Sequence, residues 1–168
     1  MTAFLFTIMA IAAALGSGLM GGVFFAFSAF VMRALGRLEP SAGIAAMQSI
    51  NRAVLNPPFM AVFFGTAAAC LVVILVSLWR WHGLSAVFLL TGGGFYLVGG
   101  ITVTMVFNVP LNRALAEVEP ADRDSIARWD DYVRRWTAWN HVRTIACLAA
   151  SALLILGVYC EAAGRVSP

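Results

Sequence analysis

The chain has 168 residues, of which 61% are hydrophobic and only 11% are charged. Soluble domains carry roughly 25% charged residues, so this composition excludes a soluble globular domain. The net charge is only +3, and acidic residues are mixed with the arginines of residues 122–135. This mixture excludes a nucleic-acid-binding patch, and we expect a lipid bilayer as the surrounding partner.

Four apolar windows cover residues 3–32, 57–79, 84–107 and 139–159. Each reaches the roughly 20 residues that a helix needs to span a bilayer core of about 30 Å. The first window has no basic residue before Arg33 and is too long for the core of a signal peptide, so we expect it to span the membrane. The sequence therefore predicts four transmembrane helices in a single transmembrane domain, residues 1–168.

The orientation of these helices follows from the basic residues in the short connections, because such residues favour the cytoplasmic side. The first and third connections together hold eight arginines, and the opposite side holds two. We therefore expect both long connections in the cytoplasm and both termini outside, in the inner (plasma) membrane of a bacterium. The arginines compared are Arg33, Arg37, Arg52, Arg113, Arg123, Arg128, Arg134 and Arg135 against Arg80 and Arg165.

The first window contains two overlapping small-residue patterns, Ser17 with Gly21 and Gly18 with Gly22. Small residues four positions apart let two helix backbones approach closely in lipid. Packing within one subunit is our main interpretation, and a homo-oligomer joined through these glycine-rich faces is the alternative.

The first connection is predicted to form a short helix over residues 41–55, with Ser41 as its N-cap. Asn56 precedes two prolines and is the predicted N-cap of the second window, because proline needs no amide partner in a first turn. Asn51 and Asn56 are therefore expected at the membrane boundary, as caps or as part of a site.

The third window is rich in glycine in its first half, so a neighbouring helix or an apolar ligand can press against it. Near its end, Pro110 cannot donate a backbone hydrogen bond, which predicts a kink if the helix continues. Asn108 and Asn112 are four residues apart, and Thr104 lies one turn before Asn108, so the three share a face. Hydrogen bonding between helices and a binding site explain this column equally well.

From Pro120 onward the pattern predicts an amphipathic helix that lies at the headgroup level or extends the fourth window. Its apolar positions are Ile126, Trp129, Val133 and Trp136.

The two halves of the chain, about residues 1–80 and 81–160, resemble one another. Residues 32–40 read MRALGRLEP, and residues 112–120 read NRALAEVEP. Each half crosses the membrane twice, so the repeats are parallel. The predicted fold is an all-α integral membrane four-helix bundle built from two parallel two-helix repeats, with short interfacial helices on the cytoplasmic side.

Polar residues concentrate in residues 136–143, WTAWNHVR, where the charged segment meets the fourth window. On a continuous helix, Asn140 and Arg143 share a narrow stripe, whereas His141 lies roughly 200° from Arg143. We expect His141 to face the interior, because Arg143 has an easy route to lipid phosphate. The candidate site residues are Phe27, Asn51, Asn56, Thr104, Asn108, Asn112, Trp136, Trp139, Asn140, His141 and Arg143.

These residue types favour acid–base chemistry on an apolar substrate. An imidazole can accept and return a proton near neutral pH, so His141 is the candidate general base. Arg143 or the asparagine amides could stabilise an enolate or phenolate oxygen. The structural alternatives are an interfacial histidine and an arginine that anchors lipid phosphate. No metal site and no cofactor are expected, since this end has one histidine and the cysteines show no paired spacing; haem with one axial histidine stays open.

Four segments carry a family resemblance: GGVFFAFSAFVM (21–32), QSINR (48–52), FNVPLN (107–112) and WxxYVRRWTxWNHVRT (129–144). The chain resembles, over nearly its whole length, small four-helix membrane proteins grouped as a domain of unknown function and called anthrone oxygenase-like. The resemblance implies oxidation of an anthrone to an anthraquinone without a recognised metal or flavin. The matching positions are Asn108, Asn112, Trp136, Trp139, Asn140, His141 and Arg143.

The residues and the resemblance are compatible with a membrane-embedded, cofactor-independent oxygenase or oxidase for an apolar polycyclic aromatic substrate. An anthrone is planar, apolar and acidic at its methylene, and its anion can react with oxygen directly. A site for it needs a base, a polar partner for the oxyanion and aromatic walls. The alternatives are a carrier for hydrophobic aromatic molecules and a structural membrane subunit.

Overall fold

The computed structural model describes residues 2–122 and 125–166, and every regular element in these residues is helical. In chain order they are α1 (Ala3–Ala26), the π-helical segment η1 (Phe27–Val31), α2 (Met32–Leu35), α3 (Pro40–Ala53), α4 (Pro57–Trp79), α5 (Leu84–Phe95), the π-helical segments η2 (Tyr96–Thr102) and η3 (Thr104–Asn108), α6 (Val109–Ala116) and α7 (Ser125–Val166). Arg123, which entered the prediction of orientation, lies outside the described residues, as do the side chains of Ile126 and Arg165.

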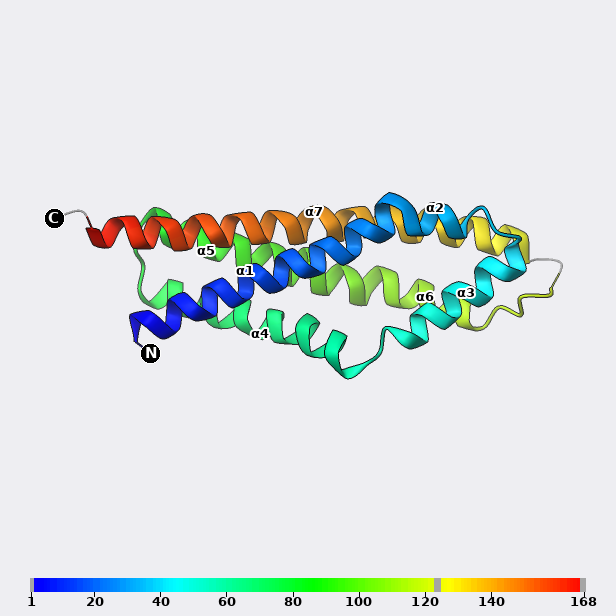
Figure 1. The fold of residues 1–168 in the computed structure, drawn as a ribbon, viewed down its shortest axis with the longest axis horizontal. Helices are drawn as coiled ribbons and strands as arrows, with labels where there is room; N and C mark the ends of the chain where they lie inside the picture. Colours follow the sequence, from blue (N-terminus) through cyan, green and yellow to red (C-terminus); the bar gives the residue numbers. More distant parts are fainter. Residues whose placement is uncertain (1, 123–124, 167–168) are drawn as a thin grey trace.

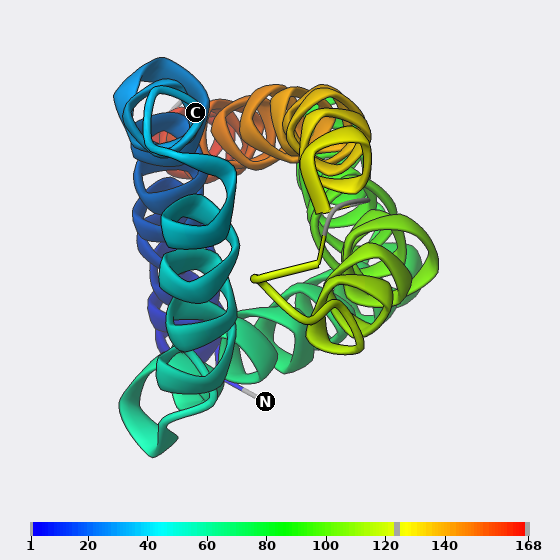
Figure 2. The same cartoon turned by 90° about the vertical axis from the view of Figure 1, so that its right-hand side faces the viewer.

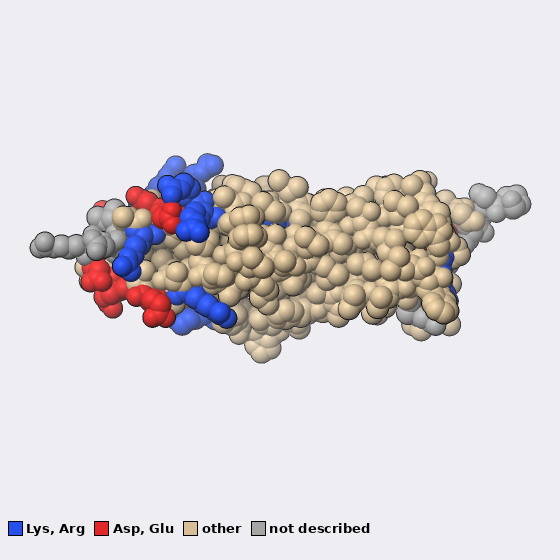
Figure 3. Space-filling view, turned by 180° about the vertical axis from the view of Figure 1, so that it is seen from behind, with Lys and Arg blue, Asp and Glu red and all other residues tan. Residues whose placement is uncertain are grey.

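Four stretches of helix are long and apolar enough to cross a membrane: Ala3–Leu35, Pro57–Trp79, Leu84–Ala116 and Ala127–Gly164. They confirm the predicted all-α architecture with four transmembrane helices. On the face shown in Figure 3, the surface away from one end of the bundle is almost free of charged side chains, as an integral membrane protein requires. The internal repeat and the side of the membrane on which each connection lies stay predictions.

The four spans run side by side along one long axis (Figure 1). Helix α7 packs most extensively against α1 and α5, and α4 completes the bundle between those two helices (Figure 2). The start of α1 and the end of α7 lie at the same end of the bundle. Charged side chains gather at the other end, residues 33–56, 111–122 and 127–135, which we call the charged end (Figure 3).

The boundaries of α3 and α4 follow from proline and asparagine chemistry. Asn56 caps α4 as predicted, because its Oδ1 accepts a 3.0 Å hydrogen bond from the amide of Phe59. The predicted N-cap role of Ser41 is wrong: α3 begins at Pro40, and Glu39 occupies the cap position without a side-chain bond. Proline fits the first turn of a helix, so the helix starts one residue earlier.

The helix continues through Pro110 rather than ending there. The π-helical segment η3 ends at Asn108, and Pro110 falls in the first turn of α6. A π-helix shifts the backbone hydrogen-bond register by one residue. Pro110 has no backbone N–H to donate, and it lies where this register changes back. The predicted irregularity at this position therefore takes the form of a π-helical segment in a continuous span.

Glycines in the first and third spans allow close packing inside the subunit. A Cβ added at Gly18 would meet Ser151, and one at Gly21 would lie 2.9 Å from Leu148. Gly99 packs in the same way against Ala146 of α7. The interpretation as packing within one subunit is confirmed for these positions. Gly22 faces open space, and a homo-oligomer stays a prediction.

The interior holds two apolar clusters. The larger one fills the bundle along the apolar spans, and its buried members include Phe6, Ala10, Met20, Phe24, Phe63, Val73, Leu89, Tyr96, Ala150 and Leu154. The second one lies at the charged end and consists of Met32, Leu35, Ile44, Met47, Leu115, Val118, Trp129, Tyr132 and Trp136. A buried polar layer separates the two clusters.

Candidate functional site

The buried polar layer is centred on one stripe of α7. Trp136, Asn140, Arg143 and Cys147 are 5%, 0%, 4% and 0% exposed, so the four share an inward face. Eighteen residues separate Arg143 from Glu161 near the other end of α7, or about 27 Å at the 1.5 Å rise of an α-helix. With Glu161 at one boundary of a hydrocarbon core about 30 Å thick, Arg143 would lie near the other boundary, at the charged end.

Arg143 is held by polar groups from two helices and by two aromatic rings. Its Nη2 donates to Oδ1 of Asn140 at 2.7 Å, and its Nη1 donates to Oγ1 of Thr104 at 3.3 Å. The Cζ atom lies 4.3 Å from the ring centroid of Phe24 and 5.0 Å from that of Trp136. Both distances are within the range of cation–π attraction, which strengthens as water is removed.

No carboxylate accompanies the buried guanidinium in the part of the chain that the structure describes. Asp131 forms ion pairs with Arg134 and Arg135, but these lie on the exposed face of α7. The Nε atom of Arg143 is buried and has no hydrogen-bond partner. A buried charge with an unsatisfied donor is costly in a membrane, which makes Arg143 a candidate functional residue.

Asn140 connects this layer to the first span. Its Nδ2 donates 2.7 Å hydrogen bonds to the carbonyl of Phe24 and to Oγ of Ser28. Ser28 lies in η1 and is 3.2 Å from the hydroxyl of Thr144, which donates to the carbonyl of Asn140. The π-helical register of η1 changes which carbonyls accept backbone hydrogen bonds within the helix. The carbonyl of Phe24 also accepts the hydrogen bond from Asn140 of α7.

The third span contributes through a second π-helical segment. Thr104 and Asn108 are the first and last residues of η3, and Thr104 also donates to the carbonyl of Gly100 at 2.6 Å. Asn108 is buried, and its Nδ2 donates to the carbonyl of Trp136 at 3.2 Å. Its Oδ1 has no partner, so the layer contains an unused acceptor as well as the unused donor on Arg143.

Asn112 forms the next layer toward the charged end. Its Oδ1 accepts hydrogen bonds from the hydroxyl of Tyr132 at 2.9 Å and from Nε1 of Trp136 at 2.8 Å. Asn51 lies beside the Tyr132 phenol, although its buried Nδ2 forms no hydrogen bond of ordinary geometry. Trp136 therefore belongs to both layers, with its ring near Arg143 and its N–H on Asn112.

The predicted inward orientation of His141 is wrong. Its side chain is exposed on the outer face of α7, and Arg143 takes the interior position instead. The helix runs through this region without interruption, so the two side chains keep their opposite directions. The hydrogen bonds of Asn140 to the first span fix the rotation of α7 and thereby turn His141 outward.

Three other predicted residues lie outside the Arg143 layer. Trp139 is half-buried and stacks on Phe107 with ring centroids 3.6 Å apart. Asn56 is exposed; its Oδ1 caps α4, and its Nδ2 donates to the carbonyl of Ala53 at the end of α3. Phe27 packs against Trp136 at a centroid distance of 5.6 Å and so supports the layer from the charged end.

The candidate residues of the sequence analysis did not include four members of the site, namely Phe24, Ser28, Tyr132 and Thr144. Tyr132 precedes Trp136 by four positions and Asn140 by eight, so helical spacing alone could have placed it on the buried stripe. Phe24 covers Arg143 from α1, and no local signal identifies it among the four neighbouring phenylalanines.

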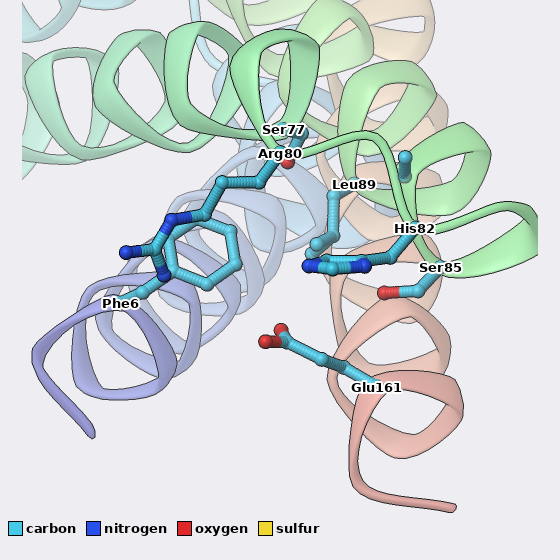
Figure 4. Close-up of a pocket in the computed structure, with 8 residues that line it drawn as sticks. Phe6, Ser77, Arg80, His82, Ser85, Leu89 and Glu161 are labelled. Carbon is cyan, nitrogen blue, oxygen red and sulfur yellow. The ribbon is translucent and has the colours of Figure 1, made fainter. Parts of the chain in front are cut away.

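The far end of the bundle has a small cleft of its own. Figure 4 shows the carboxylate of Glu161 pointing toward the space between Arg80 and His82. The cleft measures about 10 Å³, which is enough for one water molecule at most. It is too small for a polycyclic ligand. Within residues 2–122 and 125–166, no three His, Cys, Asp or Glu side chains gather where they could hold a metal ion.

A comparison with protein families matches residues 59–153, more than half of the chain, to the family described as anthrone oxygenase. The chain belongs to the anthrone oxygenase family. The matched region includes Thr104, Asn108, Asn140 and Arg143, and membership supports an oxygenase-like role. No curated protein and no solved structure matches the chain significantly.

Proposed function

We propose that this member of the anthrone oxygenase family is a membrane-embedded oxygenase that oxidises an anthrone-like polycyclic aromatic molecule with dioxygen. The observation that carries the proposal is the guanidinium of Arg143, which is buried without a carboxylate and retains an unused Nε–H donor. A positive charge in such a position favours a bound anion. The enolate of an anthrone provides that anion on an otherwise apolar body.

The proposed reaction converts the substrate's methylene into a carbonyl. The methylene loses a proton to give the enolate, dioxygen adds to the carbanionic carbon, and loss of water from the resulting hydroperoxide leaves the quinone. One dioxygen is consumed, with one oxygen atom in the quinone and one in water. The substrate is oxidised by four electrons in total, and dioxygen accepts all four.

Arg143 is the residue that we assign to the enolate oxygen. The hydrogen bonds from its two terminal nitrogens to Asn140 and Thr104 fix the guanidinium, and its Nε–H, which has no partner, is available to a ligand. A donor already fixed in place needs no reorganisation when negative charge develops. Phe24 and Trp136 supply aromatic surface on the same group.

No protein base is assigned, because the layer around Arg143 contains amides, hydroxyls and rings but no carboxylate or imidazole among the described residues. We propose that water or hydroxide takes the methylene proton and that Arg143 favours ionisation by stabilising the enolate. No metal or organic cofactor is required for this sequence of steps, since the enolate itself reacts with dioxygen.

The test uses the purified protein in lipid nanodiscs, with anthrone as the substrate and empty nanodiscs as the control for spontaneous oxidation. Anthraquinone formation and oxygen consumption are measured together. Arg143→Gln is expected to lower kcat by roughly 10²–10³-fold, the effect of losing an oxyanion donor. The exposed Arg37→Gln variant is the matched control and should keep full activity.

Two outcomes would contradict the proposal. Saturable binding of anthrone by the wild-type protein without any product would indicate the carrier. Unchanged kcat in a folded Arg143→Gln variant would show that the buried charge has a structural purpose. Circular dichroism and size-exclusion chromatography of each variant establish whether it is folded.

A further inference from the structure

A groove of about 200 Å³ lies at the charged end between α6 and α7. Water occupies about 30 Å³ per molecule in the liquid, so the groove has room for a small planar aromatic body. The wall from α6 and the turn after it is apolar and consists of Leu111, Ala114, Leu115 and Val118. The wall from α7 consists of Arg128, Asp131, Tyr132 and Arg135.

The polar rim of the groove carries an excess of positive charge. Asp131 is the acidic residue in the lining, and its carboxylate already accepts from Arg134 at 2.6 Å and from Arg135 at 3.2 Å. Arg128 lines the same rim and is exposed. An apolar wall opposite a cationic rim suits an amphiphilic organic anion better than a neutral molecule.

Tyr132 joins the groove to the buried layer. Its side chain lines the groove, although only 4% of the residue is exposed. Its hydroxyl donates to Oδ1 of Asn112, the same atom that accepts from Nε1 of Trp136. The ring of Trp136 in turn lies 5.0 Å from Cζ of Arg143. A continuous series of contacts therefore leads from the groove to the unpaired guanidinium.

We propose that this groove is the recruitment site of the enzyme, where a planar polycyclic aromatic carrying an acidic phenol or carboxyl group binds before it passes Tyr132 to reach Arg143. The proposal rests on the proposed function of the buried layer and adds a substrate class to it. The acidic group lies against the arginine rim, and the rings lie against the wall formed by α6. Tyr132 is a positioning residue that lies between the groove and the Arg143 layer.

Binding is tested with 9-anthracenecarboxylate, whose fluorescence anisotropy is measured on protein in phosphatidylcholine nanodiscs and corrected with empty nanodiscs. Ala114→Phe fills the groove and should weaken binding roughly tenfold, which corresponds to about 1.4 kcal/mol. Ala116→Phe is the matched control, because Ala116 is exposed on the same helix and does not line the groove. The double variant Arg128→Gln with Arg135→Gln should weaken binding roughly threefold to tenfold.

Kinetics distinguish recruitment from catalysis. In the anthrone assay, Ala114→Phe should raise KM and leave kcat within a factor of about two, whereas Arg143→Gln lowers kcat. If the wild-type protein binds 9-anthracenecarboxylate and Ala114→Phe does not, while neither oxidises anthrone, the groove stands and the oxygenase proposal fails.

Three results would overturn the groove proposal. One is equal affinity of wild-type protein and Ala114→Phe for 9-anthracenecarboxylate. Another is equal affinity of the wild-type protein for this anion and for neutral 9-anthracenemethanol. The third is a pair of results in phosphatidylglycerol nanodiscs: the wild-type protein no longer binds the probe, and the double variant Arg128→Gln with Arg135→Gln binds it again. That pair would show that a lipid headgroup occupies the groove.

Discussion

Asn140 holds Arg143 from one turn away on the same helix, with Oδ1 accepting a 2.7 Å hydrogen bond from Nη2. The other end of the same amide donates to the carbonyl of Phe24 in α1. One side chain therefore orients the buried charge and ties α7 to the first span. This double use makes Asn140 the residue on which the geometry of the layer most depends.

Replacing Asn140 by leucine should destabilise the protein by roughly 2–4 kcal/mol, because several buried polar groups lose their partner at once. Thermal unfolding in detergent measures the change. The double variant Asn140→Leu with Arg143→Met should lose less than the sum of the single variants, since no guanidinium is then left unpaired. Strictly additive losses would show that the two side chains do not depend on each other.

Replacing the exposed His141 by alanine should change the free energy of unfolding by no more than about 0.5 kcal/mol. Turnover of anthrone should also stay within a factor of about two, since the imidazole lies on the outer face of α7. The measurement is kcat at several pH values. A tenfold loss of kcat would restore His141 to the role of base.

Two glycines of α5 offer a matched test of helix packing. A Cβ at Gly92 would lie 3.0 Å from the backbone nitrogen of Leu154, so Gly92→Ala must push α7 away and should cost roughly 1–3 kcal/mol. Gly94 has no neighbour within 4 Å, and Gly94→Ala should be neutral or stabilising by up to about 1 kcal/mol. Equal thermal midpoints for both variants would contradict this packing.

Cys160 can report which side of the membrane the chain ends face. It is partly exposed near the end of α7, whereas Cys70 and Cys147 are fully buried. A membrane-impermeant maleimide added to intact cells should label Cys160 if the termini lie outside, as the distribution of arginines predicts. Labelling only after the cells are broken would reverse the orientation, and Cys160→Ser is the control for background.

The spans and the shared buried stripe could be predicted because hydropathy and helical periodicity depend on neighbouring residues alone. The same periodicity placed Asn140 and Arg143 on one face of α7 and His141 on another. It could not say which face points inward. That choice depends on contacts with Phe24 and Ser28, which are more than 100 residues away in the chain.

The π-helical segments were also beyond the reach of sequence patterns. Ser28, Thr104 and Asn108 all lie in them, and each contributes to the polar layer. A π-helix departs from regular spacing by a single residue, which no window of apolar residues reveals. Pro110 indicated that the third span is irregular, but its position could not specify the form of that irregularity.

Helix α7 is 42 residues long, or about 63 Å at 1.5 Å per residue, roughly twice the hydrocarbon thickness. The hydrocarbon core of a bilayer therefore covers about half of this helix, and the other half extends into water. The aromatic cluster around Trp129 and Tyr132 belongs to the half in water, where the hydrophobic effect stabilises apolar packing. Between helices in lipid this driving force is missing. Urea should therefore unfold the half of α7 in water, with its aromatic cluster, before the membrane-embedded bundle unfolds. The protein then behaves as two folding units that share the single helix α7.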